Sequence, residues 1–268
     1  LTTTTRVGIH KYTFDQADSA NIILDLVSGI YNYDGKNVNT YVRVVDAYHI
    51  VGFRQTSGWA RNRTVYFAME FSRPITGYGY DDFQSKKTYQ GFWRKFDLKN
   101  NFPEMSAPQF RAFFHIDLDA SKELLLKVSL SNVSMEGAVA NMKHETPDWN
   151  FDSYRKAGES WWENELNKFD VQMLNEGDLT NFYTAVYHTC LGPTVYQDYD
   201  GQYRGLDFSN AHNKDGQSVN YTTFSLWDTY RALHPLFNLV QRKRNADMVN
   251  SMIAHQKQSA EKMLPVWS

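Results

Sequence analysis

The residues best suited to chemistry lie together in the segment Phe224–Leu236, which reads Phe-Ser-Leu-Trp-Asp-Thr-Tyr-Arg-Ala-Leu-His-Pro-Leu. Its apolar spacing predicts a helix that ends or kinks at Pro235. Asp228 would then lie directly beside Trp227. At helical spacing, the remaining large side chains would share one face of that helix: Phe224, Trp227, Arg231 and His234.

A tryptophan beside a carboxylate suits a sugar, because the indole face covers C–H groups while the acid accepts hydrogen bonds from hydroxyls. We expect Arg231 to pair with a buried carboxylate, with Asp228 as a candidate, and to hold it ionised. His234 is expected to be a hydrogen-bonded residue at the helix end rather than a catalyst. The alternative is a satisfied polar network inside a core, which would use the same residue types.

The elements that position this segment change character along the chain. The first half predicts strands separated by turn residues and no helix-length crossover, which favours antiparallel pairing in a two-layer sandwich. The expected strand regions are Ala20–Val27, Tyr41–Val51, Thr64–Phe71, Phe110–Leu118 and Glu123–Leu130. From about Asn141–Trp149 onward the spacing becomes helical. Helices are expected around Tyr154–Phe169, Phe182–Leu191, Phe224–His234 and Val249–Gln256.

A long segment rich in Gly, Asp and Asn, Thr194–Tyr221, separates the second and third of these helices. Segments of this length inside a compact domain are usually functional or mobile. Three of its side chains, Asp198, Asp200 and Arg204, are secondary candidates for the rim of a pocket. A self-satisfied loop is the competing interpretation.

The composition describes a globular protein. The chain has 268 residues, a net charge of −2 and 42% hydrophobic residues. This balance gives no reason to expect a nucleic-acid partner, and no apolar run approaches the ~18 residues that a membrane span needs. The single cysteine, Cys190, cannot form an internal disulfide and leaves the redox compartment open.

Six segments, in this order, carry a family resemblance. The chain begins Leu-Thr-Thr-Thr-Thr-Arg-Val-Gly-Ile-His-Lys-Tyr-Thr-Phe and later reads Trp-Trp-Glu-Asn-Glu-Leu, Phe-Tyr-Thr-Ala-Val-Tyr-His and Tyr-Gln-Asp-Tyr-Asp-Gly-Gln-Tyr-Arg-Gly. The Ser-Leu-Trp-Asp-Thr-Tyr-Arg block and Leu-Pro-Val-Trp follow. Together they resemble glycoside hydrolase family 92, the bacterial exo-acting α-mannosidases. The matching segments are 1–14, 161–166, 182–188, 196–205, 224–236 and 264–267.

The resemblance implies a β-then-α architecture, an antiparallel β-sandwich followed by the first helices of an (α/α)6 toroid. The expected division is a sandwich over residues 1–142 that lacks its first strands, a linker with a helix over 143–176, and a truncated start of the catalytic domain over 177–268. On this interpretation the chain is an internal fragment of a longer enzyme, and the remainder of the same polypeptide is a partner.

The resemblance also implies an inverting reaction, assisted by Ca2+, that removes terminal mannose from glycans with a preference of the α-1,2 type. It places the catalytic acid, the base and the side chains that bind calcium outside this chain, so no catalytic or metal-binding residue is assigned here. The substrate-binding candidates are Trp227, Asp228 and Arg231, with Asp198, Asp200, Arg204 and His234 as secondary ones. The expected setting is a bacterial periplasm, a cell surface or a secreted form.

Two rival functions stay open. Another sugar enzyme with a sandwich and a toroid, such as a phosphorylase or a lyase, would have the same fold. A non-catalytic carbohydrate-binding module would instead have an aromatic platform on the sheet face. Under the leading hypothesis, residues 1–268 alone release no mannose.

Overall fold

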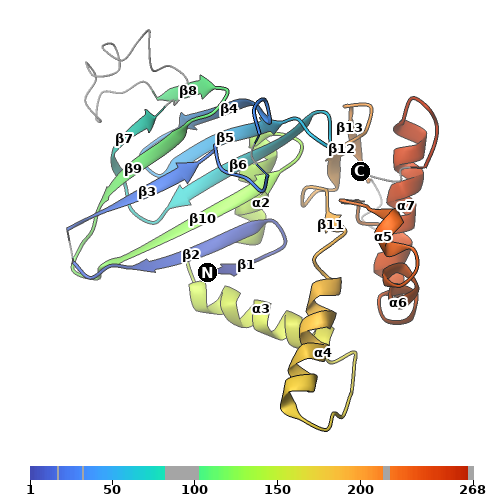
Figure 1. Ribbon diagram of the computed structural model, residues 1–268. Coiled ribbons are helices and arrows are strands. Elements are labelled where there is room, and N and C mark those ends of the chain that lie inside the picture. Colours follow the sequence, from blue (N-terminus) through green and yellow to red (C-terminus); the bar gives the residue numbers. More distant parts are fainter. Residues whose placement is uncertain (17, 32, 82–102, 214–217, 265–268) are drawn as a thin grey trace. The chain divides into compact units, whose positions relative to one another are not determined.

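We analysed a computed structural model of the chain (Figure 1), which describes residues 1–268 except 17, 32, 82–102, 214–217 and 265–268. Residues 265–267 of the Leu-Pro-Val-Trp motif therefore lie outside the described residues. The internal contacts divide the chain into two compact units, Leu1–Phe151 and Asp152–Ser268.

The first unit contains two antiparallel sheets, as the strand pattern predicts. The strand order of the seven-stranded sheet is β1 (Thr2–Thr3), β2 (Val7–Thr13), β10 (Glu123–Ser131), β6 (Arg63–Phe71), β5 (His49–Thr56), β4 (Asn37–Val44) and β8 (Glu104–Ala107). The order of the three-stranded sheet is β3 (Ser19–Asp25), β9 (Arg111–Asp117) and β7 (Ile75–Asp81).

One apolar core joins the two sheets, so the expected sandwich is confirmed. Alternate residues of β9, Ala112, Phe114 and Ile116, are fully buried and face the same cluster as Phe71 of the larger sheet. The rings of Phe71 and Phe114 lie 5.9 Å apart between centroids. A period of two along each strand thus gives each sheet one apolar inner face.

Two details of the first unit differ from the sequence-based expectation. The run Tyr41–Val51 is not one strand: it contains the end of β4, a turn and the start of β5, and Asp46 accepts hydrogen bonds from the backbone N–H groups of Tyr48 and His49 in that turn. In addition, an unexpected helix, α2 (Met135–Glu145), follows β10 and covers the outer face of the larger sheet (Figure 1). The hydroxyl of Ser134 caps its first turn.

The second unit is helical with short hairpins. Its helices are α3 (Phe151–Leu166), α4 (Glu176–Thr189), α5 (Leu226–Thr229), α6 (Leu233–Val240) and α7 (Arg242–Gln258). Thr194–Tyr221 contains short strands rather than a bare loop: β11 (Thr194–Val195) pairs with β14 (Tyr221–Thr222), and β12 (Gln202–Arg204) pairs with β13 (Asn210–His212). The β-then-α order of the fold is therefore confirmed.

The predicted single helix over Phe224–His234 is wrong. The chain forms one turn of helix in α5, leaves the helical path after Tyr230, and starts again in α6 at Leu233. Pro235 lies in the first turn of α6, where its missing N–H would have no partner within the helix. Pro235 therefore belongs to the start of the next helix and does not end the previous one.

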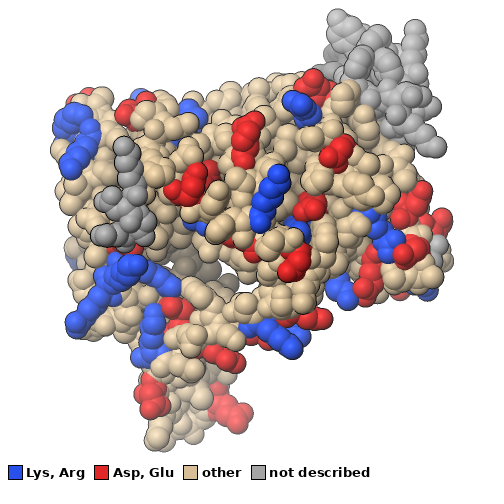
Figure 2. Space-filling view, turned by 180° about the vertical axis from the view of Figure 1, so that it is seen from behind, with Lys and Arg blue, Asp and Glu red and all other residues tan. Residues whose placement is uncertain are grey.

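A small apolar core supports these short helices, consisting of Tyr221, Phe224, Phe237 and Met248. The buried side of α7 is otherwise mostly polar, with Asn245, Asp247, Ser251 and His255 all under 10% exposed. On the surface drawn in Figure 2, acidic and basic side chains are interspersed. Within the described ranges, no helix is long and apolar enough to cross a bilayer.

Candidate functional site

Trp227 and Asp228 lie on α5 with their side chains open to solvent. The indole of Trp227 is 74% exposed, whereas Phe224, three residues earlier, is 2% exposed in the core below. Asp228 is exposed as well. The expected common face of Phe224 and Trp227 is therefore wrong: Phe224 anchors the turn and Trp227 faces outward. We call Ser225–Arg231 the tryptophan–aspartate corner.

The carboxylate of Asp228 is held by its own turn. The hydroxyl of Ser225 donates to Asp228 Oδ2 at 2.5 Å, and the N–H of Asp228 donates to the carbonyl of Ser225 at 3.0 Å. Thr223 precedes the corner with φ at +63°, a left-handed conformation that is strained for a β-branched residue. The N–H of Thr194 donates to the Thr223 hydroxyl and ties this residue to β11.

Arg231 does not pair with Asp228 as expected. Its Nε donates to the hydroxyl of Tyr230 at 2.5 Å, and its guanidinium lies 5.3 Å from the centre of that ring. Arg231 and Tyr230 are both exposed. The break in the helix explains the difference, because the i, i+3 spacing brings side chains together only on a continuous helix.

His234 is hydrogen-bonded, as expected, but it lies in the first turn of α6 and not at the end of the preceding helix. Its Nδ1 lies 2.9 Å from Asn245 Oδ1, and Asn245 Nδ2 in turn donates to Asn238 Oδ1 at 2.7 Å. Its ring also contacts the edge of Phe237. His234 Nε2 is buried and has no hydrogen-bond partner among the described residues. These contacts join α6 to α7 beneath the corner.

The secondary candidates at the β12–β13 hairpin each contact a near neighbour in the sequence. Asp198 is 4% exposed, and its carbonyl accepts the N–H of Gly201, which has φ at +90° in the tight turn. Asp200 accepts from the backbone and side chain of Gln202. The guanidinium of Arg204 lies 5.2 Å from the centre of the Phe208 ring. These residues lie on a hairpin of their own and not on the turn that carries Trp227.

Buried polar side chains of α7 contact the residues that lie directly beneath the corner. The hydroxyl of Ser251 accepts the N–H of Tyr221 at 3.0 Å, and the ring edge of His255 contacts Phe224 with centroids 5.9 Å apart. Burial lowers the pKa of His255 below its ordinary value of 6.5. His255 Nδ1 lacks a hydrogen-bond partner in the described part of the chain.

Sequence reasoning missed a second polar cluster, built around Glu165 at the end of α3. Its carboxylate accepts two hydrogen bonds from Arg244 at 3.0 Å each, one from Gln241 at 2.6 Å and one from Lys168 at 2.8 Å. Arg244 also lies over the ring of Trp161, 5.0 Å from its centre. We call this set the Glu165 cluster. Burial alone would raise the pKa of Glu165, but the hydrogen bonds from Lys168 and Gln241 and the charge of Arg244 lower it.

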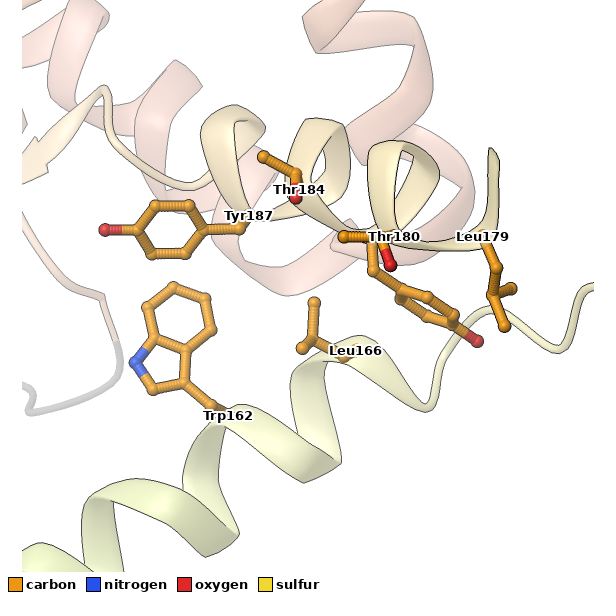
Figure 3. A pocket seen from close by; sticks show the side chains of 7 residues that line it. Trp162, Leu166, Leu179, Thr180, Thr184 and Tyr187 are labelled. Carbon is orange, nitrogen blue, oxygen red and sulfur yellow. The ribbon is translucent and has the colours of Figure 1, made fainter. Parts of the chain in front are cut away.

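A shallow apolar pocket of about 540 Å³ lies between α3 and α4 (Figure 3). The rings of Trp162 and Tyr187 face each other across it at 5.0 Å between centroids. The lining residues are Trp162, Leu166, Leu179, Thr180, Tyr183, Thr184 and Tyr187. None of them is titratable near neutral pH, so the pocket offers packing surface rather than acid–base groups.

The described residues do not provide a fit for calcium. Calcium takes six to eight oxygen ligands, usually with several carboxylates. In the described part of the chain, no group of three or more His, Cys, Asp and Glu side chains is arranged to hold a metal ion. We therefore derive no step through a metal from this chain.

Two family models match the chain and together span nearly all of it. The model described as "Glycosyl hydrolase family 92 N-terminal domain" matches residues 1–131, and the one described as "Glycosyl hydrolase family 92 catalytic domain" matches residues 137–268. The comparison with curated proteins found no match.

Solved structures agree with these matches. The family GH92 alpha-mannosidase BT3965 from Bacteroides thetaiotaomicron is 36% identical, with a TM-score of 0.85 over 99% of this chain and 34% of that chain. A second structure of that protein is a complex with mannoimidazole.

The inverting mannosidase BT2199 from Bacteroides thetaiotaomicron shares the fold at 22% identity, with a TM-score of 0.80 over 98% of this chain and 33% of that chain. The chain thus spans about a third of the length of the structures it matches. From its motifs, its β-then-α fold and these matches, the chain belongs to glycosyl hydrolase family 92.

Proposed function

We propose that this chain forms part of an exo-acting α-mannosidase and that its tryptophan–aspartate corner binds the terminal mannose. The observation that carries the proposal is the orientation of Trp227 and Asp228. Both side chains are open to solvent, while the turn that presents them is anchored through Phe224. Family membership and the alpha-mannosidase BT3965 supply the substrate class.

The corner can supply two kinds of contact to a sugar. The indole of Trp227 offers an apolar face for C–H groups of the ring. Asp228 accepts hydrogen bonds from sugar hydroxyls, while Ser225 fixes one of its oxygens. Arg231 can donate to a further hydroxyl from its terminal nitrogens, since only its Nε bonds to Tyr230. Asp198, Asp200, Arg204 and His234 would act around this site as rim or supporting residues.

Glycoside cleavage requires two carboxyl groups, one that protonates the leaving oxygen and one that activates water or attacks. We propose that the remainder of the same polypeptide supplies both groups, together with the side chains that bind Ca2+, and that the reaction inverts the anomeric carbon. The role of this chain is then to bind and orient the sugar, which affects the rate wherever those contacts strengthen in the transition state.

The finer properties of the enzyme are proposals on the same basis. We propose a preference for α-1,2-linked terminal mannose on glycans and a location in the periplasm, at the cell surface or outside a bacterial cell. We further propose that residues 143–176 link a sandwich over 1–142 to a catalytic domain that begins at 177. The toroid of that domain would be completed by chain outside these residues.

The test uses the full-length protein that contains this chain and mannobioses with α-1,2, α-1,3 and α-1,6 linkages. Release of mannose supports the proposed function, and NMR of the first anomer formed reports inversion as β-mannose. Cleavage that depends on phosphate would indicate a phosphorylase, and an unsaturated product a lyase. Residues 1–268 alone should release no mannose. Turnover by this segment, or none by the full-length protein, would contradict the proposal.

A further inference from the structure

We propose that the first unit has a sugar-binding pocket of its own, between the outer face of the larger sheet, α2 and the turn Thr146–Trp149. The pocket has a volume of about 230 Å³. Pockets for drug-sized ligands run from ~300 Å³ upward, so this one suits a single small ring. The choice of mannose as that ring rests on the proposed function, but the pocket itself is argued from its own side chains.

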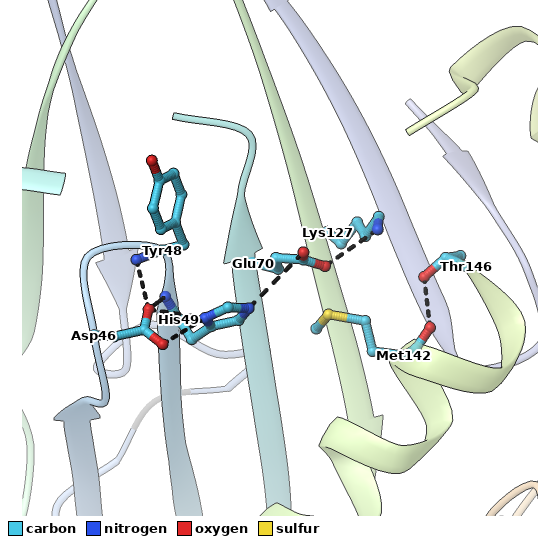
Figure 4. A network of polar contacts seen from close by, with 7 residues as sticks. All are labelled: Asp46, Tyr48, His49, Glu70, Lys127, Met142 and Thr146. Atoms are coloured by element: carbon cyan, nitrogen blue, oxygen red, sulfur yellow. Dashed lines mark hydrogen bonds and ion pairs between the residues drawn. The ribbon is translucent and has the colours of Figure 1, made fainter. Parts of the chain in front are cut away.

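A polar row crosses three neighbouring strands at the pocket. In the antiparallel register, His49 of β5 lies opposite Glu70 of β6, and Glu70 lies opposite Lys127 of β10. All three side chains line the pocket, and Figure 4 shows them in sequence with Asp46 at the end of the row. Cross-strand neighbours on one face are within contact distance, so the row is fixed by the sheet.

Lys127 is the buried member of the row. It is 2% exposed, and its ammonium lies 3.1 Å from Glu70 Oε2 and 4.0 Å from the centre of the Trp149 ring. An ammonium has three donors, and one of them is used by Glu70. A buried lysine with donors left over can serve a ligand that enters the pocket.

The other end of the row presents two acceptors. Asp46 accepts from His49 Nδ1 at 2.8 Å, so an imidazole that carries a single proton has it on Nδ1 and offers Nε2 as an acceptor. This atom lies 3.8 Å from Glu70 Oε1, which is too long for a direct hydrogen bond. Such a gap between polar atoms is commonly bridged by a third group.

The donors and acceptors available in the pocket indicate which kind of ligand it can bind. Two acceptors side by side require two donors, and the ammonium of Lys127 requires an acceptor. Two carboxylates, Glu70 in the lining and Asp46 beside His49, balance the two ammonium groups of the lining, Lys127 and Lys143, so the charges favour neither a simple anion nor a simple cation. Adjacent hydroxyls of a neutral sugar both donate and accept. The apolar walls, which include Met142, Pro147 and Trp149, suit the C–H faces of the same ring.

The test is an NMR titration of the 15N-labelled 268-residue chain with methyl α-D-mannopyranoside. The chain has seven tryptophans, and the indole N–H signal of Trp149 is assigned by its loss in Trp149→Phe. We expect this signal to shift saturably, and the shift to persist in Asp228→Asn. Inorganic phosphate, as the anionic probe, should leave it in place.

Glu70→Gln should weaken the binding at least about tenfold, since an acceptor that carries charge is lost. The matched control is Glu123→Gln, a carboxylate on β10 that pairs with Lys11 on the surface. It should bind as the wild type does. The remaining indole signals report whether each variant is folded.

The Trp227 signal separates this proposal from the proposed function. If Trp149 responds and Trp227 does not, the pocket is supported, and the corner is tested separately by Asp228→Asn in the full-length enzyme. If Trp227 responds and Trp149 does not, the pocket proposal is overturned by itself. A saturable response of Trp149 to phosphate but not to the mannoside would also overturn it, because it would show an anion site.

Discussion

Two clusters in the second unit use nearly the same residue types and differ in what those residues touch. The Glu165 cluster combines Trp161, Glu165 and Arg244, and the guanidinium both bonds the acid in two places and covers the indole. The tryptophan–aspartate corner combines the same chemical groups, but its acid bonds to Ser225 and its arginine to a neighbouring tyrosine.

The difference shows how to separate a structural cluster from a binding one. Glu165 has an 11% exposed side chain and uses both oxygens within the protein. Trp227 is 74% exposed and leaves its ring face to solvent. Residue types were alike in both places, so the distribution of partners, rather than composition, distinguishes the two.

The largest expected effect is the loss of stability in Glu165→Ala. Removing the carboxylate leaves Arg244 and Gln241 without their main acceptor in a poorly solvated place. Breaking such a pair costs about 3 kcal/mol in the free energy of unfolding, measured by urea titration. The exposed ion pair of Glu159 with Arg155 provides the control, since Glu159→Ala should change it by under ~1 kcal/mol. Equal effects in the two variants would show that the Glu165 cluster is not structural.

In contrast to Glu165→Ala, Asp228→Asn should lower catalytic activity more than stability. In the full-length enzyme we expect kcat/KM for an α-mannobiose to fall about 10- to 100-fold, the range for losing hydrogen bonds to a charged group. Because Asp228 is exposed, the urea midpoint should stay close to that of the wild type. Full activity in Asp228→Asn would contradict the proposal that the corner binds the substrate.

As the pH falls, the stabilising contribution of His255, beneath the corner, should be lost before that of the Glu165 cluster. Burial lowers the pKa of His255, so the unfolded chain binds this proton more readily than the folded one. The contribution of His255 is intact above its ordinary pKa of about 6.5 and falls as the pH drops below that value. The pKa of Glu165 is lowered as well, so its contribution is lost only at a lower pH, below the ordinary carboxyl value of 4.5.

Urea titrations between pH 7 and pH 5 test this order. His255→Gln should flatten the dependence in that range, because glutamine does not titrate there. A dependence that is unchanged in His255→Gln would assign the sensitivity to other groups.

The smallest expected effect is that of Ser225→Ala. The variant removes the hydroxyl that fixes Asp228 Oδ2 but leaves the acid itself. We expect a stability change of about 0.5–1 kcal/mol, as for loss of a helix-start hydroxyl, and a few-fold rise in KM with little change in kcat. Ser209→Ala on the β13 side is the matched control, since its hydroxyl serves Asp207 in the same way. A loss as large as that of Asp228→Asn would mean that Ser225 contacts the sugar itself.

Much of the fold was predictable because its strands show a local pattern. In β9, Ala112, Phe114 and Ile116 alternate with half-buried residues, and this period of two is visible in the sequence. Helix α2 was missed because its sequence, with Gly137 and few large apolar residues, has a weak helical pattern of its own. It is stabilised by its contacts with β10, which directly precedes it, and with β6, which is distant from it in sequence.

The candidate site was predictable in its residue types but not in its geometry. Phe224 and Phe237 both belong to the small core of the second unit. In one straight helix they would lie about 20 Å apart, too far to share a four-residue core. The chain therefore bends between α5 and α6. Trp227 points away from Phe224 for a different reason: α5 begins only at Leu226, so Phe224 lies before the helix and not on its face. Local propensity around Arg231 and Ala232 favours a continuous helix and gives no signal of the bend.

The sequence alone determined the family, the order of strands and helices, and which aromatic and acidic residues stand next to each other, because these depend on local pattern and on motifs. Only the tertiary structure decided which polar side chains face solvent. Whether Glu165 is enclosed or Asp228 left open depends on contacts between residues far apart in the chain, such as Arg244 with Glu165 and His255 with Phe224. Burial is a property of those contacts and not of the residue that is buried.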